Sequence, residues 1–423
     1  MRVLFALYAE KTHLFSMVPL AWALQAAGHE VRIASQPELA PTITATGLTA
    51  VPVGKDHSLW RIPSSQEVAR SGRIPPFHAA DLPDRELRWE YLESGYASSV
   101  RWWLGMVNDP LVEGLTRLAL SWRPDLVVWE QTSFAGAIAA EACGAAHART
   151  TWAPDFHGRL RDRYLRLKAA RPEGQRDDPL QEWLTRQAQR FGVPYSERLV
   201  RGHFTIEQLP EAMSWNTGPD YLRMRYVPYN GQAVVPDWLR SEPERPRIAL
   251  SLGRSATDRS YGYSVPLAEL LGRLHELDAE VVATASPQAR RSLGPLPDNV
   301  RVVDFVPLLA LLPTCSAVIH HGGFGSMATA MLAGVPQLVL SQPLGGSFMG
   351  DGLARYGAGL HTPSARASGP EVAASVRGLL TEPRYRRRAA ELRAEALALP
   401  SPAGVVPELE ARSAGPRTTA VRV

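Results

Sequence analysis

Cysteine is scarce in this chain of 423 residues, which contains only Cys143 and Cys315. Two cysteines exclude both a disulfide scaffold and a cysteine-rich zinc site. We therefore expect a reducing, cytoplasmic compartment. The sequence also has no run of about 18 apolar residues, and its amino end turns polar too early for a secretory signal. We expect a protein that neither spans a membrane nor is exported.

Lysine is equally scarce, because only Lys11, Lys55 and Lys168 stand among the 46 basic residues. The formal net charge is +4, and the arginines alternate with acidic residues instead of forming a block. That distribution argues against a nucleic-acid partner. The one arginine cluster, at 384–388, falls on an expected helix that acidic residues interrupt, so we interpret it as a solvated helix face.

Short apolar runs alternate with helix-length segments in the first half of the chain. Residues 2–7 (RVLFAL) precede a segment at 17–27 with apolar side chains at helical spacing, and Gly28 ends it before a second strand-like run. The same theme returns around residue 128, where RPDLVVWE leads into SFAGAIAAEACG. This alternation predicts an α/β fold with a parallel, doubly wound sheet.

A second domain follows a segment at 219–246 that is rich in proline, contains an Asn-Gly turn, and is typical of a linker. The strands expected after it read IALSL, EVVATA, VRVVDFV, AVIHH and QLVLS. We predict two Rossmann-like domains, residues 1–218 and 247–398, that face each other across a cleft, and a tail over 399–423. Ligands of such sheets bind beyond the carboxyl ends of the strands, so the cleft is the expected active site.

Residues 56–110 break this alternation with prolines and many aromatic side chains. The segment either adds packing or forms the wall of a pocket for a flat, apolar ligand, and the sequence leaves both interpretations open. The residues expected to contact such a ligand are Trp60, Phe77 and, from a later segment, Trp152.

The strongest local signal is HHGGFGS at 320–326, where a strand runs into glycines and then into a helix of small residues. Glycine lets the backbone approach a ligand closely. The free N–H groups and the positive dipole end of such a helix favour a phosphate or pyrophosphate. The residues expected at this anion are His321, Gly322, Gly323, Gly325 and Ser326.

A dinucleotide site is the alternative, because Gly323, Gly325 and Ala328 fit the pattern G-x-G-x-x-A. The acidic residue that this pattern requires about 20 residues further on is missing. The motif also falls in the second expected domain. We therefore reject a nicotinamide-dependent oxidoreductase.

Three stretches together resemble one known family: HHGGFGS with AGVPQLVL after it, FVPLLALLP just upstream, and the amino-terminal H-x5-PLA-x-ALxxxGHEV. They are similar to the marks of inverting, nucleotide-sugar-dependent glycosyltransferases of the GT-B fold. The sequence looks most like actinomycete enzymes that attach deoxysugars to macrolide, anthracycline or related polyketide aglycones in antibiotic biosynthesis. The resemblance extends over nearly the whole chain.

The resemblance implies a catalytic pair. His13, expected in the loop after the first strand, would be the base that deprotonates an acceptor hydroxyl. Imidazole accepts protons near neutral pH, and a general base contributes about 100- to 10,000-fold. Such a base usually needs a carboxylate on its other nitrogen, and Glu130 stands about where relatives carry an acid. A carboxylate paired with an arginine is the alternative for Glu130.

The resemblance also implies the donor contacts. Gly253 and Ser255 would contact the donor phosphates, and Val306 with Pro307 would pack on the pyrimidine base or bind it through backbone groups. No D-x-D pair with a carboxylate cluster is evident, and the family handles the leaving pyrophosphate with N–H groups, His and Ser. We expect no metal and no cofactor, with a dTDP-sugar as cosubstrate.

The chain departs from the family pattern at Gly345 and Gly346, where relatives that transfer ordinary hexoses carry Asp-Gln. The acid accepts hydrogen bonds from sugar hydroxyls, so its loss suggests a donor stripped of hydroxyls, such as an amino-dideoxy or more reduced sugar. A defective donor site is the rival explanation, and it would fit a non-catalytic scaffold or activator of another glycosyltransferase.

The partners that the resemblance implies are a dTDP-deoxysugar and a hydrophobic aglycone. The macrolide-like subgroup often needs an auxiliary activator protein related to haem monooxygenases, and residues 56–110 and 155–200 are where we would expect its contact. The sequence leaves a homo-oligomer open.

Overall fold

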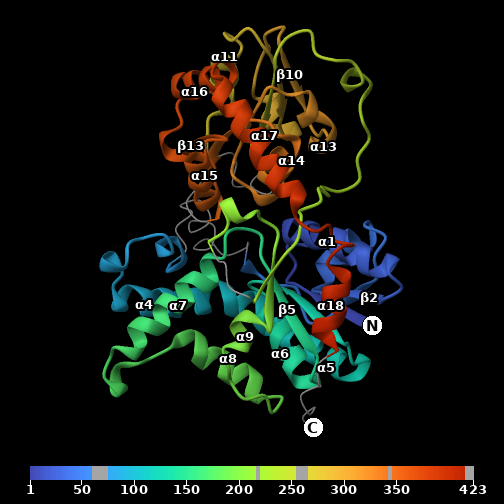
Figure 1. Ribbon diagram of the computed structural model, residues 1–423, viewed down its shortest axis with the longest axis vertical. Coiled ribbons are helices and arrows are strands. Elements are labelled where there is room, and N and C mark those ends of the chain that lie inside the picture. Colours follow the sequence, from blue (N-terminus) through green and yellow to red (C-terminus); the bar gives the residue numbers. More distant parts are fainter. Residues whose placement is uncertain (60–74, 216–219, 254–264, 342–344, 415–423) are drawn as a thin grey trace.

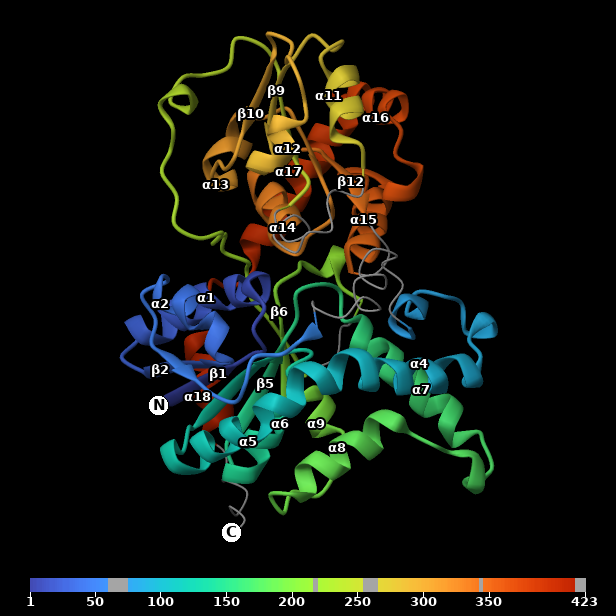
Figure 2. The ribbon, with the colours of Figure 1, turned by 180° about the vertical axis from the view of Figure 1, so that it is seen from behind.

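The computed structural model describes residues 1–59, 75–215, 220–253, 265–341 and 345–414, which form two α/β domains stacked along the long axis (Figure 1). In each domain helices cover a parallel sheet, and Figure 2 shows the same arrangement from behind. The predicted fold class, two doubly wound domains, is confirmed.

Among the described residues, the first sheet has seven parallel strands in the order β3-β2-β1-β4-β5-β6-β7. Its central strands read as continuous apolar runs because both of their faces are buried under helices. The strands are β1 (Arg2–Ala6), β2 (Glu30–Ser35), β3 (Ala50–Pro52), β4 (Leu126–Glu130), β5 (Ala146–Thr150), β6 (Phe204–Glu207) and β7 (Tyr221–Arg223).

The helices of this domain include an insertion between β3 and β4 that contains a π-helical segment, Val100–Leu104. None of the described helices has the length and apolar character needed to cross a bilayer. They are α1 (Lys11–Ala26), α2 (Ala40–Thr44), α4 (Trp89–Ser99), α5 (Gly105–Trp122), α6 (Phe134–Cys143), α7 (Phe156–Ala169), α8 (Pro179–Gln189) and α9 (Arg198–Arg201).

The second sheet has six described strands in the order β10-β9-β8-β11-β12-β13, again parallel. They are β8 (Arg247–Ser251), β9 (Glu280–Thr284), β10 (Val300–Val303), β11 (Ala317–His320), β12 (Gln337–Ser341) and β13 (Gly359–Pro363). The helices around and after this sheet are α11 (Leu267–Leu274), α12 (Pro287–Arg291), α13 (Leu308–Leu311), α14 (Phe324–Ala333), α15 (Gly345–Tyr356), α16 (Gly369–Thr381), α17 (Pro383–Ala398) and α18 (Val406–Ser413).

Each sheet reverses its strand order at one point. In the first sheet β1 and β4 are neighbours, and the chain builds outward from them in opposite directions. In the second sheet β8 and β11 have the same relation. Ligands of doubly wound sheets bind at the carboxyl ends of the strands at such a reversal. The residues that follow β1, β4, β8 and β11 are therefore where a site is expected.

The structure differs from the predicted elements in several places. Helix α1 begins at Lys11 rather than near residue 17, because the Glu10 side chain caps it and accepts from the Thr12 backbone N–H. Strands β5, β6, β7 and β13 were not predicted. β7 lies within the range expected as linker and pairs with β6, and the predicted domain boundaries stay predictions.

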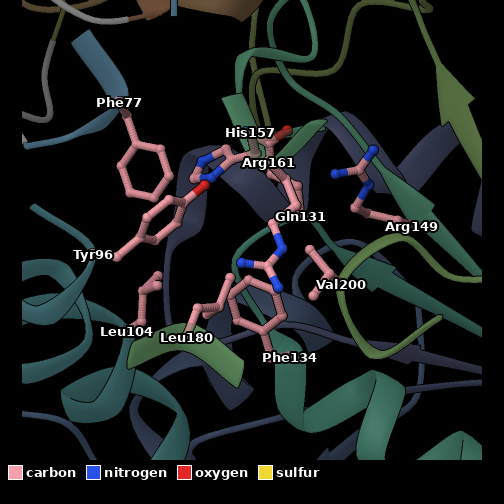
Figure 3. A pocket seen from close by; sticks show the side chains of 10 residues that line it. All are labelled: Phe77, Tyr96, Leu104, Gln131, Phe134, Arg149, His157, Arg161, Leu180 and Val200. Carbon is pink, nitrogen blue, oxygen red and sulfur yellow. The ribbon is translucent and has the colours of Figure 1, made fainter. Parts of the chain in front are cut away.

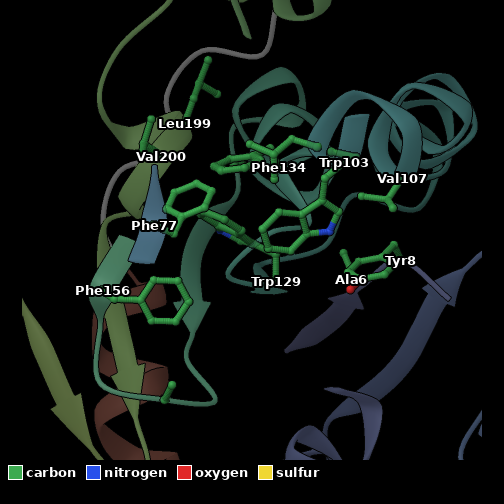
Figure 4. Packing of buried hydrophobic residues seen from close by; sticks show 14 of the residues in the cluster. Ala6, Tyr8, Phe77, Trp103, Val107, Trp129, Phe134, Phe156, Leu199 and Val200 are labelled. Atoms are coloured by element: carbon green, nitrogen blue, oxygen red, sulfur yellow. The ribbon is translucent and has the colours of Figure 1, made fainter. Parts of the chain in front are cut away.

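The aromatic insertion packs largely into the core of the first domain (Figure 4). Trp129 of β4 is fully buried beside Phe134, and the Phe77 ring meets Trp103 edge to face with centroids 5.9 Å apart. Of the two interpretations left open, packing is therefore correct for most of the described part of this segment. Trp60 lies outside the described residues.

The two domains share an apolar contact. Phe348 of α15 lies against Phe156 and Trp215 of the first domain, with ring centroids 5.5 and 4.8 Å apart. The Met213 side chain also meets Gly352 of α15. This contact brings α15 and the start of α7 together at the carboxyl ends of both sheets.

Candidate active site

His13 and Glu130 lie at the carboxyl ends of β1 and β4, the pair of strands at which the first sheet reverses. The loop position predicted for His13 is wrong, since this residue lies in the first turn of α1. The expected proximity to Glu130 is present in the structure: His13 Nδ1 lies 3.4 Å from Glu130 Oε1. Among the described residues no arginine pairs with Glu130.

The Glu130 carboxylate is buried and held from several sides. Its Oε1 accepts from the Trp152 indole N–H at 2.8 Å, and its Oε2 accepts from the hydroxyls of Thr132 at 2.7 Å and Ser133 at 2.9 Å. The Trp152 ring also stacks on His13 with centroids 4.8 Å apart. These contacts fix the carboxylate and one face of the imidazole.

Electrostatics keep Glu130 ionised. Burial acts to raise the pKa of this carboxyl, but the charge of His13 and the hydrogen bonds that the carboxylate accepts outweigh it, so the pKa lies below its usual value. An ionised Glu130 facing Nδ1 favours a proton on that nitrogen. We infer that Nε2 of His13 is left to accept a proton from a ligand.

In the second domain the HHGGFGS signature forms the turn between β11 and α14. Gly322 takes a positive φ of 83°, which favours glycine, and Gly323 is the N-cap of α14. No side chain caps this helix, so the N–H groups of its first turn, which includes Gly325 and Ser326, lack helical partners. An uncapped helix N-terminus at the reversal of the sheet suits an anion.

His320, the last residue of β11, is a buried structural group. Its Nδ1 accepts from the Gly322 backbone N–H at 3.1 Å, so its Nε2 carries the proton and donates to Gln337 Oε1 at 2.8 Å. Burial lowers its pKa to about 4. The ring is therefore neutral and holds the turn to β12.

His321 lies in a narrow slot between two glycines. A Cβ at Gly323 would stand 2.4 Å from His321 Nε2, and a Cβ at Gly253 would stand 2.5 Å from the ring. Burial lowers the pKa of His321, against a backbone hydrogen bond at Ser251 that raises it. The Nδ1 atom has no hydrogen-bond partner among the described residues. The two glycines thus leave room for the His321 ring.

The other predicted donor residues have different surroundings. Val306 is buried in an apolar cluster, so only its backbone is left for a ligand, and Pro307 is the N-cap of α13. Gly325 faces the segment that follows β7, because a Cβ there would lie 3.4 Å from both Asn230 Oδ1 and the Tyr226 hydroxyl. Ser255 lies outside the described residues.

Gly345 and Gly346 have a packing reason to be glycine. A Cβ at Gly345 would lie 3.0 Å from the Trp152 ring of the first domain, and one at Gly346 would lie 3.0 Å from the Gly322 carbonyl oxygen. A side chain at Gly345 would press on the Trp152 ring, and one at Gly346 would press on the Gly322 backbone. The glycines at 345 and 346 are therefore explained by packing and do not require a defective donor site.

The acceptor residues predicted from the sequence lie at two depths. Trp152 is half-buried beside His13, where a bound acceptor would meet it. Phe77 is buried and lines a small internal cavity of the first domain (Figure 3). Only Trp152 therefore lies directly against the catalytic pair.

Next to the Gly322 turn lies a row of hydrogen-bonded side chains that was not predicted from the sequence. Ser341 Oγ and His361 Nε2 are 2.7 Å apart, and so are His361 Nδ1 and Asp351 Oδ1. A Cβ at Gly322 would lie 3.1 Å from the Ser341 Cβ, so the Ser341–His361–Asp351 hydrogen bonds lie directly against the turn. The sequence shows only that His361 follows Asp351 by ten residues. This spacing does not predict a contact unless α15 and β13 are already known.

One cluster in the described residues has metal-ligand chemistry: Glu141, His147 and His203, whose ligand atoms lie within 4.8 Å of one another. His147 Nδ1 accepts from the Trp129 indole N–H at 3.1 Å, so Nε2 carries the proton and donates to Glu141. A protonated Nε2 is not a metal ligand. The cluster is therefore a hydrogen-bonded structural group, and the absence of a catalytic metal stays a prediction.

The buried histidines make stability depend on pH. The folded pKa of His320 is about 4 against an ordinary value of 6.5, so the unfolded chain binds the extra proton between these values. We expect the stability contributed by neutral His320 to be fully present above about pH 6.5. As the pH falls towards 4, this group should lower the free energy of unfolding by roughly 3 kcal/mol. Denaturant titrations of the wild type and His320→Gln at pH 7 and pH 5 test this. Equal losses in both proteins would contradict it.

A histidine–carboxylate pair at the reversal of one sheet and an uncapped helix N-terminus at the reversal of the other are the features expected of a GT-B-type transferase. Residues 22–253 match the Erythromycin biosynthesis protein CIII-like N-terminal domain, and residues 268–412 match the corresponding C-terminal domain. The chain belongs to this CIII-like family of glycosyltransferases.

Full-length relatives support the assignment. The chain is 44% identical to 10-deoxymethynolide desosaminyltransferase of Streptomyces venezuelae, over 97% of this chain and 96% of that protein. It is 44% identical to TDP-daunosamine transferase DnrS of Streptomyces peucetius, over 99% of both. The crystal structure of glycosyltransferase VinC in complex with dTDP matches with a TM-score of 0.87, at 39% identity, over 98% of this chain and 99% of that one. The family predicted from the sequence is confirmed.

Proposed function

We propose that this protein transfers a deoxysugar from a dTDP-sugar to a hydroxyl of a polyketide aglycone in antibiotic biosynthesis. The observation that carries the proposal is the His13–Glu130 pair at the reversal of one sheet, with the uncapped α14 N-terminus at the reversal of the other. The relatives named as desosaminyl and daunosamine transferases, and the VinC complex with dTDP, support the donor class.

The mechanism follows from these positions. Nε2 of His13 takes the proton of the acceptor hydroxyl while the oxygen attacks the anomeric carbon from the side opposite the diphosphate. The bond between that carbon and the diphosphate oxygen breaks, and the electron pair leaves with dTDP. The N–H groups at the start of α14 stabilise the charge that develops on the diphosphate. A single displacement of this kind inverts the anomeric centre.

Ionised Glu130 stabilises the imidazolium that forms on His13. Trp152 contributes twice, because its indole N–H binds the carboxylate while its ring stacks on the imidazole. Gly345 lets α15 approach this ring closely. The contact between the two domains therefore reaches the Trp152 ring that holds the proposed catalytic pair.

The donor is proposed to be a deoxysugar, since Gly345 and Gly346 offer no side chain to bind sugar hydroxyls. We expect kcat/KM with dTDP-glucose or UDP-glucose to be at least about tenfold lower than with a dTDP-linked amino-deoxysugar, because a hydroxyl buried without a partner is costly. A donor panel analysed for product by mass spectrometry measures this. Equal efficiency with glucose donors would contradict the sugar assignment.

The same panel tests the reaction itself. Suitable acceptors are 10-deoxymethynolide and aklavinone, which appear in the names of two relatives. Nucleotide binding without sugar transfer across the panel would favour the scaffold alternative. An auxiliary activator remains a proposal, and full activity of the purified chain alone would remove it.

A further inference from the structure

Helix α1 begins with a lysine, although the start of a helix favours the opposite charge. Lys11 is the first residue of α1, and the first turn of this helix contains no acidic residue. The positive end of the helix dipole makes a cation unfavourable there. Lys11 is exposed and forms no ion pair in the described part of the chain, while the carboxylate of the preceding Glu10 accepts from Thr12 instead. The ammonium group is therefore left for a partner outside the chain.

The start of α1 lies where the two domains face each other. Strand β1 leads into α1 and strand β11 leads into α14, so both helices begin at the carboxyl ends of their sheets. The two helices also contact each other, with α1 at the upper side of the first domain and α14 at the lower side of the second in both views (Figures 1 and 2). Lys11 is thus on the side of the first domain that faces the proposed diphosphate turn.

The segment that follows β7 joins the Lys11 face of α1 to the first turn of α14. Phe15 stands one helical turn after Lys11 on the same face. A Cβ at Gly231 would lie 3.7 Å from the Phe15 ring. The neighbouring Asn230 has its Oδ1 3.4 Å from the place where a Cβ of Gly325 would stand. Two consecutive residues therefore span the distance between this face of α1 and the start of α14.

The Lys11 ammonium group lies on that same face. Its Nζ is 5.6 Å from the centroid of the Phe15 ring, and Phe15 Cζ is the atom that approaches Gly231. His13 is two positions further along and points to another side of the turn, towards Glu130. The first turn of α1 therefore directs the proposed base and the ammonium group to different sides.

The turn between β11 and α14 has little positive charge of its own. The first turn of α14 carries no charged side chain. Burial lowers the pKa of His320 to about 4 and also lowers that of His321, so neither ring favours the charged form. A helix N-terminus supplies about half an elementary charge, whereas the diphosphate of a sugar donor carries about two negative charges. A cation from the facing domain would therefore stabilise a diphosphate bound here.

We propose that Lys11 binds the donor diphosphate from the side of the first domain, opposite the start of α14. The proposal rests on the function proposed above and deepens it, because it adds a side chain that stabilises the leaving group. When the bond between the anomeric carbon and the diphosphate oxygen breaks, the electron pair leaves with dTDP. Lys11 keeps its protons and balances the charge that develops on that oxygen.

Calorimetric titration with dTDP tests this proposal by comparing the wild type with Lys11→Met. Methionine keeps an unbranched side chain against Phe15 but has no charge, and we expect dTDP affinity to fall about tenfold or more. Lys11→Arg should restore most of the affinity. Raising the ionic strength should weaken dTDP binding more in the wild type than in Lys11→Met, because salt screens an exposed ionic contact. A merely structural role of Lys11 would not change this response to salt.

The matched control is Lys55→Met, which removes the same charge from another exposed lysine of the first domain. It should bind dTDP as the wild type does. Equal dTDP affinity in the wild type and Lys11→Met would overturn the proposal, and so would an equal loss in Lys55→Met, which would indicate an effect of net charge. A wild type that binds no dTDP would overturn this proposal together with the proposed function. If dTDP binding depends on Lys11 but the donor panel gives no sugar transfer, only the proposed function fails.

Discussion

His13→Ala should lower turnover by at least about 100-fold while leaving dTDP affinity unchanged. The reason is geometric: within the described part of the chain, the His13 ring lies against Glu130 through Nδ1, and its Nε2 is the nitrogen that we propose takes the proton of the acceptor. The turn that we propose as the diphosphate site lies on the other domain and loses no contact. Steady-state kinetics and calorimetric titration with dTDP, carried out on the same preparation, separate the two effects.

A matched control is His275→Ala, because His275 is an exposed residue after α11. It should retain wild-type turnover. The turnover of Glu130→Gln should fall between that of His13→Ala and that of His275→Ala, since the amide keeps the shape of the carboxylate but cannot stabilise an imidazolium. Undiminished turnover of His13→Ala would remove the proposed base and with it the mechanism.

Gly323→Ala should have the second large effect, a loss of dTDP affinity of about tenfold or more. The new Cβ would stand 2.4 Å from His321 Nε2, so either the ring or the helix start must move. The N–H groups that would meet the diphosphate lie on that helix start. Calorimetric titration with dTDP measures the loss, and thermal unfolding monitors the fold.

The control for this change is Gly272→Ala in α11, where the added methyl group meets no atom within 4 Å. This exposed helical position should tolerate alanine and gain up to about 1 kcal/mol of stability. If Gly323→Ala binds dTDP as tightly as the Gly272→Ala control does, the turn is not the diphosphate site.

The turn between β11 and α14 could be predicted because its signal is local, whereas the pairing of His13 with Glu130 was implied only by the resemblance to a known family. Three glycines between an apolar strand and a small-residue helix allow few other structures. His13 comes shortly after the apolar strand β1 and Glu130 ends the apolar strand β4, and parallel strands that flank a reversal bring their carboxyl ends together. The helical position of His13 was missed because the cap by Glu10 does not follow the usual Ser, Thr or Asp pattern closely.

Strand β5 shows why other parts could not be predicted. Its sequence AHART looks polar, yet His147 and Arg149 are buried in it, because Glu141 accepts a hydrogen bond from the His147 ring and Asp155 balances the charge of Arg149. Each partner stands six residues away in the sequence, but the pairing depends on where α6 and β5 end and leaves no periodic signal. The Trp152 hydrogen bond to Glu130 was hidden for the same reason, since it depends on where β5 ends.

The return of the chain to the first domain has a mechanical consequence. After α17, which packs on α14, helix α18 lies against the first sheet through Val405, Val406 and Leu409. The Arg225 backbone N–H, on the outward path, donates to the Pro400 carbonyl on the way back at 2.8 Å. Two adjacent crossings joined by a hydrogen bond restrain how one domain can turn relative to the other more than a single crossing would. We therefore expect any change in the angle between the domains to take place about these two crossings, which limits how far His13 and the α14 N-terminus can move out of alignment.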